Sequence, residues 1–172
     1  WSDCARFNNL TRDLLLLLYK AGCRKLVFGF ETGSEKLLKL IDKRLDLEHA
    51  RNVLKWCREI GIWAELEVII GLPYEFEEDF QATYTFIDEA INEKLISGFQ
   101  LNKYFVVPVS LFGRYPEKYG IELVRIRGSY EKLVRKSWEQ FIENKQTRNT
   151  NFQLFRFNEI QGRSYKQIFK ET

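Results

Sequence analysis

Two matching stretches decide the fold of this 172-residue sequence, Lys25-Leu-Val-Phe-Gly-Phe-Glu-Thr-Gly-Ser-Glu35 and Glu65-Leu-Glu-Val-Ile-Ile-Gly-Leu-Pro-Tyr-Glu75. Each is an apolar run that ends in glycine and carboxylates, and each precedes a helical pattern. Ligands of parallel α/β folds bind at the carboxyl ends of the strands. The two stretches therefore predict two edges of one binding mouth.

The segments around these stretches repeat the order helix, glycine, strand. Helices that end at Gly22 and Gly61 each precede an apolar run, which predicts strands at Lys25–Phe30 and Ile62–Ile70, and a third strand is predicted at Gly98–Val107. Strands that alternate with helices at this period indicate right-handed crossovers and a parallel sheet. Three such units are too few to close a barrel, so we predict an open half-sheet whose first strand is an unpaired edge.

Helical periodicity predicts which side chains face the core. After Asp46, apolar residues recur at the i, i+3, i+4 and i+7 positions of a buried helix face, namely Ala50, Val53, Leu54, Cys57 and Ile60. The helix predicted at Glu77–Glu93 carries a similar stripe, formed by Phe80, Tyr84, Ile87 and Ile91. We expect Val53, Leu54 and Cys57 to face the core between helix and sheet.

The pattern changes in the last third of the chain. A short strand is predicted at Ile121–Ile126, an amphipathic helix at Ser129–Glu143, and an aromatic and basic tail from Phe152. The sequence therefore predicts an α/β domain over residues 1–121 and a helical, aromatic extension over residues 122–172.

Composition excludes several classes of protein. The formal charge of +3 is small and both signs are interspersed, which gives no case for a nucleic-acid partner. No apolar stretch is long enough to span a membrane. Cys4, Cys23 and Cys57 are widely spaced, which favours a reducing, cytoplasmic location over a disulfide framework and forms no metal motif. The sequence has no Met and opens on Trp1, so we interpret it as a segment of a longer protein.

Two glutamates alternate with apolar residues in the second predicted strand. This alternation places Glu65 and Glu67 on one face, together with Ile69 and Gly71. A strand that is covered on both faces is nearly all apolar, so two carboxylates on one face need an explanation. The pattern leaves two interpretations open: a face solvated because the sheet is incomplete, or a barrel lumen that holds polar ligand groups.

The end of the first predicted strand is equally open to two interpretations. Glu31 is followed by Gly33, which allows close approach of the backbone, and by Ser34, whose amide begins a helix. A ligand site would use these features. A capped βα turn, which is a common structure, accounts for them as well.

The combination of motifs resembles the second half of a radical S-adenosylmethionine (SAM) enzyme, in particular the group whose members often carry a cobalamin-binding domain. The resemblance runs from about Arg6 to Ile121. Its motifs in this sequence are Lys20-Ala-Gly-Cys23, Gly29-Phe-Glu-Thr-Gly-Ser34, Gly61-Ile62, Ile70-Gly-Leu-Pro-Tyr-Glu75 and Pro116-Glu-Lys-Tyr-Gly-Ile121. At Tyr74 the sequence departs from many relatives, which have Gly there.

The resemblance implies the C-terminal half of a partial (βα)6 TIM-like barrel, with parallel strands, helices on the outer face and SAM in the lumen. It implies that Glu31 contacts the SAM ribose or amino group, that Lys43 pairs with the SAM carboxylate and that Glu67 points at SAM. The other implied cofactor-binding residues are Ile69 and Gly71, near the adenine, and Ser34, at the first turn.

The CxxxCxxC cluster motif of such enzymes lies in the first half of their barrel and is absent from this sequence. Without the three thiolates of this motif the chain cannot hold a 4Fe-4S cluster. We therefore expect no catalytic residue and no metal ligand here, and an isolated chain that is inactive. The full-length protein would supply the missing N-terminal half, the cluster and, through another domain, cobalamin where it is used, and its substrate stays unknown. The alternative hypothesis is a non-catalytic α/β module for interaction or ligand binding.

Overall fold

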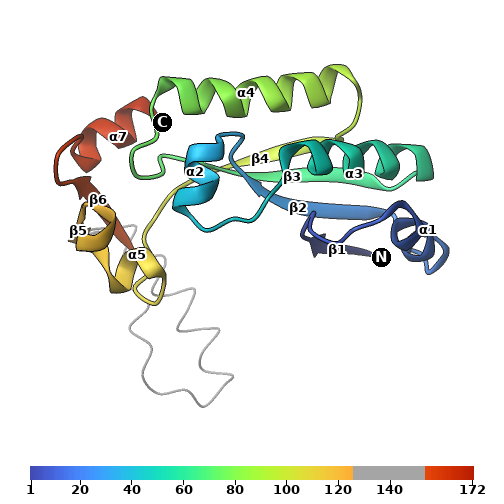
Figure 1. Cartoon of the computed structure of the whole chain (residues 1–172), viewed down its shortest axis with the longest axis horizontal. Coiled ribbons are helices and arrows are strands. Elements are labelled where there is room, and N and C mark those ends of the chain that lie inside the picture. The colour runs from blue at the N-terminus through green and yellow to red at the C-terminus, as the bar shows by residue number, and fades with distance from the viewer. Residues whose placement is uncertain (126–153) are drawn as a thin grey trace, which may run out of the picture. The chain divides into compact units, whose positions relative to one another are not determined.

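The computed structural model describes residues 1–125 and 154–172 (Figure 1). The helix predicted at Ser129–Glu143 lies outside the described residues. Contacts within the chain divide it into two compact units, Trp1–Lys103 and Tyr104–Thr172. The boundary predicted at residue 121 falls within the second of these units, where Ile121 begins a strand.

The first unit is built on a four-stranded sheet in which every neighbouring pair is parallel. The strands follow one another in chain order, β1 (Ser2–Ala5), β2 (Lys25–Glu31), β3 (Trp63–Ile70) and β4 (Gly98–Lys103). The prediction of three adjacent parallel strands in this order is confirmed, although β4 ends four residues earlier than predicted.

The prediction that the first strand of the pattern is an unpaired edge is wrong. β1 pairs with β2 from Ser2 opposite Lys25 to Ala5 opposite Phe28. β1 reads Ser-Asp-Cys-Ala and is mostly exposed. A short edge strand of this kind shows no alternation of apolar and polar residues, so its sequence carries no strand signal.

Four helices connect the strands of this unit, α1 (Arg12–Lys20), α2 (Glu35–Leu40), α3 (Leu47–Ile60) and α4 (Glu77–Asn92). The first three helices are each capped by the residue before them, Thr11, Ser34 and Asp46. The side chain of each capping residue accepts a hydrogen bond from a backbone N–H of the first turn, which satisfies one of the donors that a helix start leaves unpaired. Gly61 ends α3 at a φ of 93°, a left-handed conformation that glycine adopts without strain. These signals explain why the predicted helix ends match the observed ones.

One hydrophobic core lies between the helices and one face of the sheet, and α3 and α4 run along the strands (Figure 1). β2 and β3 supply Leu26, Phe28, Phe30, Ala64, Leu66 and Val68. α3 supplies Ala50, Val53, Leu54 and Cys57, all fully buried as predicted, with Ile60 packed at the margin. In the first unit, the opposite face of the sheet carries polar side chains, Glu65 and Glu67 among them.

The apolar stripe of α4 is mostly exposed. Ile87 is buried, but Phe80, Tyr84 and Ile91 are 41%, 55% and 45% exposed. The helix instead buries the face that contains Asp79, Thr83, Phe86, Ile87 and Ala90. Two of these side chains are polar, and the hydrogen bonds that justify their burial are described below.

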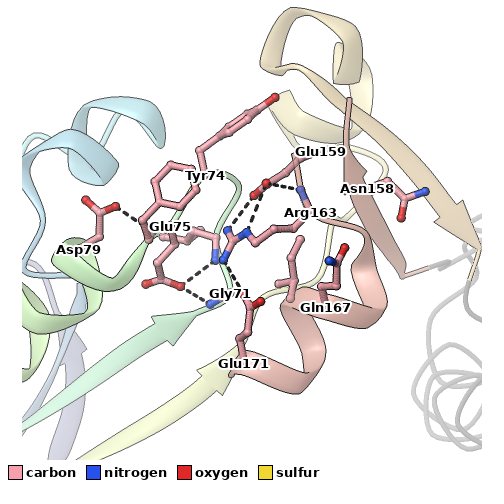
Figure 2. Close-up of polar contacts among 12 residues, drawn as sticks. Gly71, Tyr74, Glu75, Asp79, Asn158, Glu159, Arg163, Gln167 and Glu171 are labelled. Carbon is pink, nitrogen blue, oxygen red and sulfur yellow. Dashed lines mark hydrogen bonds and ion pairs between the residues drawn. The ribbon is translucent and has the colours of Figure 1, made fainter. Parts of the chain in front are cut away.

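In its described part the second unit combines short helices with strands, and the prediction of a helical extension over residues 122–172 stays a prediction. It contains α5 (Leu111–Arg114), a 3-10 helix η1 (Pro116–Tyr119), an antiparallel pair of strands β5 (Ile121–Arg125) and β6 (Phe155–Glu159), and α7 (Tyr165–Glu171). Two aromatic residues of the predicted tail, Phe155 and Phe157, thus lie in a strand. Arg163 pairs with Glu159 at 2.8 Å and with Glu171 at 3.0 Å, which ties α7 to β6 (Figure 2).

Within residues 1–125 and 154–172, no helix combines the length and the apolar character that crossing a membrane requires.

Candidate cofactor site on the open face of the sheet

The face of the sheet that points away from the helices is polar. Along β2 and β3, fully buried side chains alternate with partly exposed ones, so the residues at every second position share this open face. They include Val27, Gly29 and Glu31 of β2 and Glu65, Glu67 and Ile69 of β3. The structure thus places Glu31, Glu67 and Ile69, three of the residues proposed from the sequence, on one face.

Glu31 and Lys43 form an ion pair at the carboxyl end of β2. The Lys43 ammonium lies 2.8 Å from Glu31 Oε1, and the two side chains are 22% and 19% exposed. Glu31 has a φ of 68° and follows a register shift between β2 and β3, so the strand bulges where the carboxylate emerges. Lys43 comes from the segment after α2. Helix α2 therefore brings together two residues that are twelve positions apart.

Gly29 makes room for this ion pair. A Cβ atom at Gly29 would lie 2.7 Å from Glu31 Oε1 and 3.1 Å from Lys43 Nζ, both closer than ordinary contact. The sequence analysis did not assign Gly29 a role. A glycine inside a strand is a known sign of close approach by another group, and this signal could have found it.

Glu65 and Glu67 have different partners. Glu65 pairs with Lys25 of the neighbouring strand at 2.7 Å. Glu67 instead accepts a hydrogen bond from the side-chain amide of Asn102 on β4, at 2.6 Å. Asn102 was also missed from sequence, although a polar residue at an open-face position of a predicted strand could have been noticed.

The Ser34 side chain is used by the fold. Its hydroxyl accepts a hydrogen bond from the Leu37 amide and donates one to Asp79 Oδ1 at 2.5 Å, and the residue is buried. Next to it, the Gly33 amide donates to Thr83 Oγ1 at 2.9 Å. A cap for α2 is therefore confirmed, and a direct role of Ser34 in cofactor binding stays a prediction.

Asp79 joins the starts of α2 and α4. It accepts hydrogen bonds from Ser34, from the Lys36 ammonium and from the Phe76 amide. Burial by itself would raise the pKa of Asp79, but the hydrogen bonds from Lys36, Ser34 and Phe76 outweigh it and hold that pKa below its ordinary value. This network, with Thr83, explains why α4 buries a partly polar face in place of the predicted apolar stripe.

The loop after β3 is closed by Glu75. Gly71 has a φ of 81°. The backbone amides of Gly71 and Leu72 both donate hydrogen bonds to Glu75 Oε2, so the buried carboxylate folds back on the end of the strand (Figure 2). Tyr74 has a φ of 57°, in the left-handed region that favours glycine. The tyrosine therefore adopts the kind of backbone conformation that a glycine would readily supply. The predicted position of Gly71 near an adenine is not tested by these contacts.

The cysteines lie on separate elements. Cys4 is exposed on β1, whereas Cys23 and Cys57 are buried, and all three are free thiols. Burial, with a smaller contribution from Cys23, raises the pKa of Cys57 to about 12, so its thiolate is scarce at neutral pH. Among the described residues, no group of three His, Cys, Asp or Glu side chains is arranged to hold a metal ion.

Comparison with protein families places these features in context. Residues 5–87 match the model of the Radical SAM superfamily. The match contains β2, β3 and the Glu31–Lys43 pair, whereas β4 lies beyond the matched residues.

Individual relatives extend the comparison beyond the matched residues. The chain is 30% identical over 148 residues to the cytidylyl-2-hydroxyethylphosphonate methyltransferase of Streptomyces wedmorensis. The aligned region covers 78% of this chain and 25% of that protein. The radical SAM methyltransferase TsrM from Kitasatospora setae, solved with cobalamin and a 4Fe-4S cluster bound, is 21% identical with a TM-score of 0.59, over 73% of this chain and 26% of TsrM.

Coproporphyrinogen III oxidase (HemN) from Escherichia coli, described as a radical SAM enzyme, is 20% identical with a TM-score of 0.56, over 90% of this chain and 34% of HemN. The chain therefore spans about a quarter to a third of these three relatives. The four-stranded parallel sheet is consistent with part of a radical SAM barrel.

Proposed function

We propose that this chain is the C-terminal part of a radical SAM domain, and that its open sheet face binds SAM in the full-length enzyme. When bound there beside a reduced 4Fe-4S cluster, SAM would be cleaved to start radical chemistry on a substrate that is not identified. The observation that carries the proposal is the ion pair of Glu31 and Lys43 at the carboxyl end of β2, on the face that also presents Glu67.

The charges on this face fit the charges of SAM. The amino-acid end of SAM carries an ammonium and a carboxylate, and its sulfur carries a positive charge. Lys43 can take the carboxylate while Glu31 takes the ammonium or the ribose hydroxyls, so each exchanges its present partner for one of opposite charge on the ligand. Glu67 would face the same ligand from the neighbouring strand, with Ile69 and Gly71 beyond it.

The cysteines of this chain do not fit an iron–sulfur cluster. Cys23 and Cys57 are buried in the core and Cys4 is exposed on an edge strand. A cluster needs several thiolates that converge on one point. The cluster ligands would therefore come from the missing part of the enzyme, and we expect the isolated chain to be inactive. Cobalamin, where the full-length protein uses it, would likewise be held by another domain.

Calorimetric titration of SAM into the anaerobically prepared full-length protein tests the proposal. A charge-assisted hydrogen bond contributes about 1.5–3 kcal/mol, so Glu67→Ala should weaken SAM binding about ten- to a hundredfold. Glu65→Ala is the matched control, because Glu65 lies on the same face and is paired with Lys25. It should change the affinity less than about twofold.

Circular dichroism should show both variants folded, since neither glutamate is part of the hydrophobic core. A full-length wild-type protein that does not bind SAM would contradict the proposal. Equal affinities in wild type and Glu67→Ala would instead favour the solvated-face interpretation of this strand.

A further inference from the structure

The three carboxylates on the open face differ in the charge of their partners. Glu65 pairs with Lys25 and Glu31 pairs with Lys43, so each of these negative charges is balanced by an ammonium of the chain itself. Glu67 accepts from the amide of Asn102. An amide donates a hydrogen bond without cancelling the charge. Of these three glutamates, Glu67 is therefore the one whose charge is still available to a positively charged ligand.

The strand register shows how Asn102 orients this carboxylate. Gln100 lies directly opposite Glu67, whereas Asn102 lies opposite Ile69, two residues closer to the carboxyl end of β4. The hydrogen bond is thus diagonal and draws the Glu67 carboxylate toward the carboxyl edge of the sheet. Diagonal neighbours on parallel or antiparallel strands are within reach of long side chains such as glutamate. The carboxyl edge is also where Glu31 and Lys43 meet.

The two oxygens of the Glu67 carboxylate are used differently. The Asn102 amide binds Oε2 at 2.6 Å. Within residues 1–125 and 154–172, Oε1 of Glu67 has no hydrogen-bond partner and is not sealed in the core. One oxygen is therefore fixed by the protein while the other can be met by a ligand.

We propose that Asn102 is a positioning residue, which holds Glu67 by one oxygen so that the other meets a cationic group of the ligand, an ammonium or a sulfonium. The inference rests on the proposed function, because it assumes that the open face binds SAM. A lysine at this position would fix the carboxylate equally well, but it would neutralise the charge. The neutral amide fixes the carboxylate and keeps its charge.

A double-mutant cycle on the full-length protein, read by calorimetric titration of SAM, tests this role. Asn102→Ala should weaken SAM binding about three- to tenfold, because a freely rotating Glu67 must be ordered by the ligand. In a Glu67→Gln background the same substitution should change affinity less than about twofold, since there is no carboxylate left to position. Asn102→Leu, which is close in shape, repeats the test if alanine is not tolerated.

Gln100→Ala is the matched control, an amide on the same face and the direct neighbour of Glu67 in the ladder. It should leave SAM affinity within about twofold of wild type. Equal losses from Asn102→Ala in both backgrounds, or no loss in the wild-type background, would overturn the positioning role while leaving the proposed function intact. A wild-type protein that does not bind SAM would overturn the proposed function and this role with it.

Discussion

Gly29→Ala should damage the candidate site and spare the fold. Its new Cβ would lie 2.7 Å from Glu31 Oε1, whereas ordinary contact begins at 3.4 Å, so the carboxylate must retreat by about 0.7 Å. Lys43 Nζ, at 3.1 Å, must also give way. Both atoms are ends of flexible side chains, so the backbone can stay in place while the ion pair changes its geometry.

The effect on stability is expected to be small because two contributions oppose each other. A partly exposed ion pair contributes about 0–1 kcal/mol, which is the most that its distortion can cost. Replacing glycine by alanine inside a strand recovers about 0.5–1 kcal/mol of chain entropy. The free energy of unfolding should therefore change by less than about 1 kcal/mol.

The effect on ligand binding is expected to be larger. If Glu31 and Lys43 both bind SAM, moving them disturbs at least one charge-assisted hydrogen bond of about 1.5–3 kcal/mol. SAM affinity should then fall about tenfold or more. The measurements are calorimetric titration of SAM and thermal unfolding, both on the full-length protein.

Gly98→Ala is the matched control for this experiment. It adds a methyl group to the same face of the sheet, on β4, and its nearest atom would be Glu65 Cγ at an ordinary 3.9 Å. SAM affinity should stay at the wild-type value, and the free energy of unfolding should rise by about 0.5–1 kcal/mol at most. The reasoning is refuted if Gly29→Ala binds SAM as tightly as Gly98→Ala does, because the pair would then lie away from the ligand.

Three further predictions concern the packing of the fold. Gly33→Ala should destabilise the protein by about 1–3 kcal/mol in urea unfolding, because its Cβ would lie 2.7 Å from the Ala82 carbonyl oxygen and 2.8 Å from Thr83 Cα, which are backbone atoms. Because the pKa of Asp79 is lowered in the folded state, its carboxylate should stabilise the fold at pH values above 3.8, the ordinary pKa of an aspartate, and this contribution should be lost as pH falls through the lower folded pKa. Asp79→Asn should be less stable at pH 7 and should lack this acid-dependent part of the unfolding free energy. An Asp79→Asn variant with the pH profile of the wild type would contradict the prediction. A thiol-reactive dye should modify exposed Cys4 quickly and Cys57 only on unfolding, and rapid labelling of Cys57 in the native protein would show that its burial is misjudged.

The central strands could be predicted from sequence because their physics is local. β2 is a short apolar run that ends in glycine and a carboxylate, and β3 alternates Glu65 and Glu67 with apolar residues, so both signals are visible in the residues themselves. β1 has no such pattern and is recognised only by its hydrogen bonds to β2. The order of the parallel strands could be predicted because successive strands are separated by similar lengths of chain, each long enough for one helical crossover.

The buried face of α4 could not be predicted from hydropathy. Asp79 and Thr83 are polar, and they are buried because Thr32, Gly33 and Ser34 offer hydrogen bonds from another part of the chain. Their partners are between 45 and 51 residues away in sequence. An apolar stripe is therefore a reliable guide to the core only where no such partners exist.

Some residues of the candidate site were proposed from the sequence and others were missed. Glu31 was indicated by its place at the end of a predicted strand, but Lys43 came from the resemblance alone, because no periodicity links residues on either side of a short helix. Their contact in the structure is an independent observation. Gly29 and Asn102 were missed because each acts on another residue of the site, Gly29 through the space it leaves and Asn102 through a hydrogen bond.

The alternation of Glu65 and Glu67 left open whether this face is solvated or lines a lumen, and the two residues now support different answers. Glu65 lies opposite Gly98, where β4 begins, and forms an ion pair with Lys25 that is about one-third exposed, as on an ordinary surface. Glu67 lies between Gly29 and Gln100 in the ladder, so neither residue directly opposite it is a cation. A partly buried carboxylate without a counter-ion is costly to the fold unless something else meets its charge. That cost, at the carboxyl half of the strand and beside Asn102, favours a site for a cationic ligand at Glu67 and a solvated surface at Glu65.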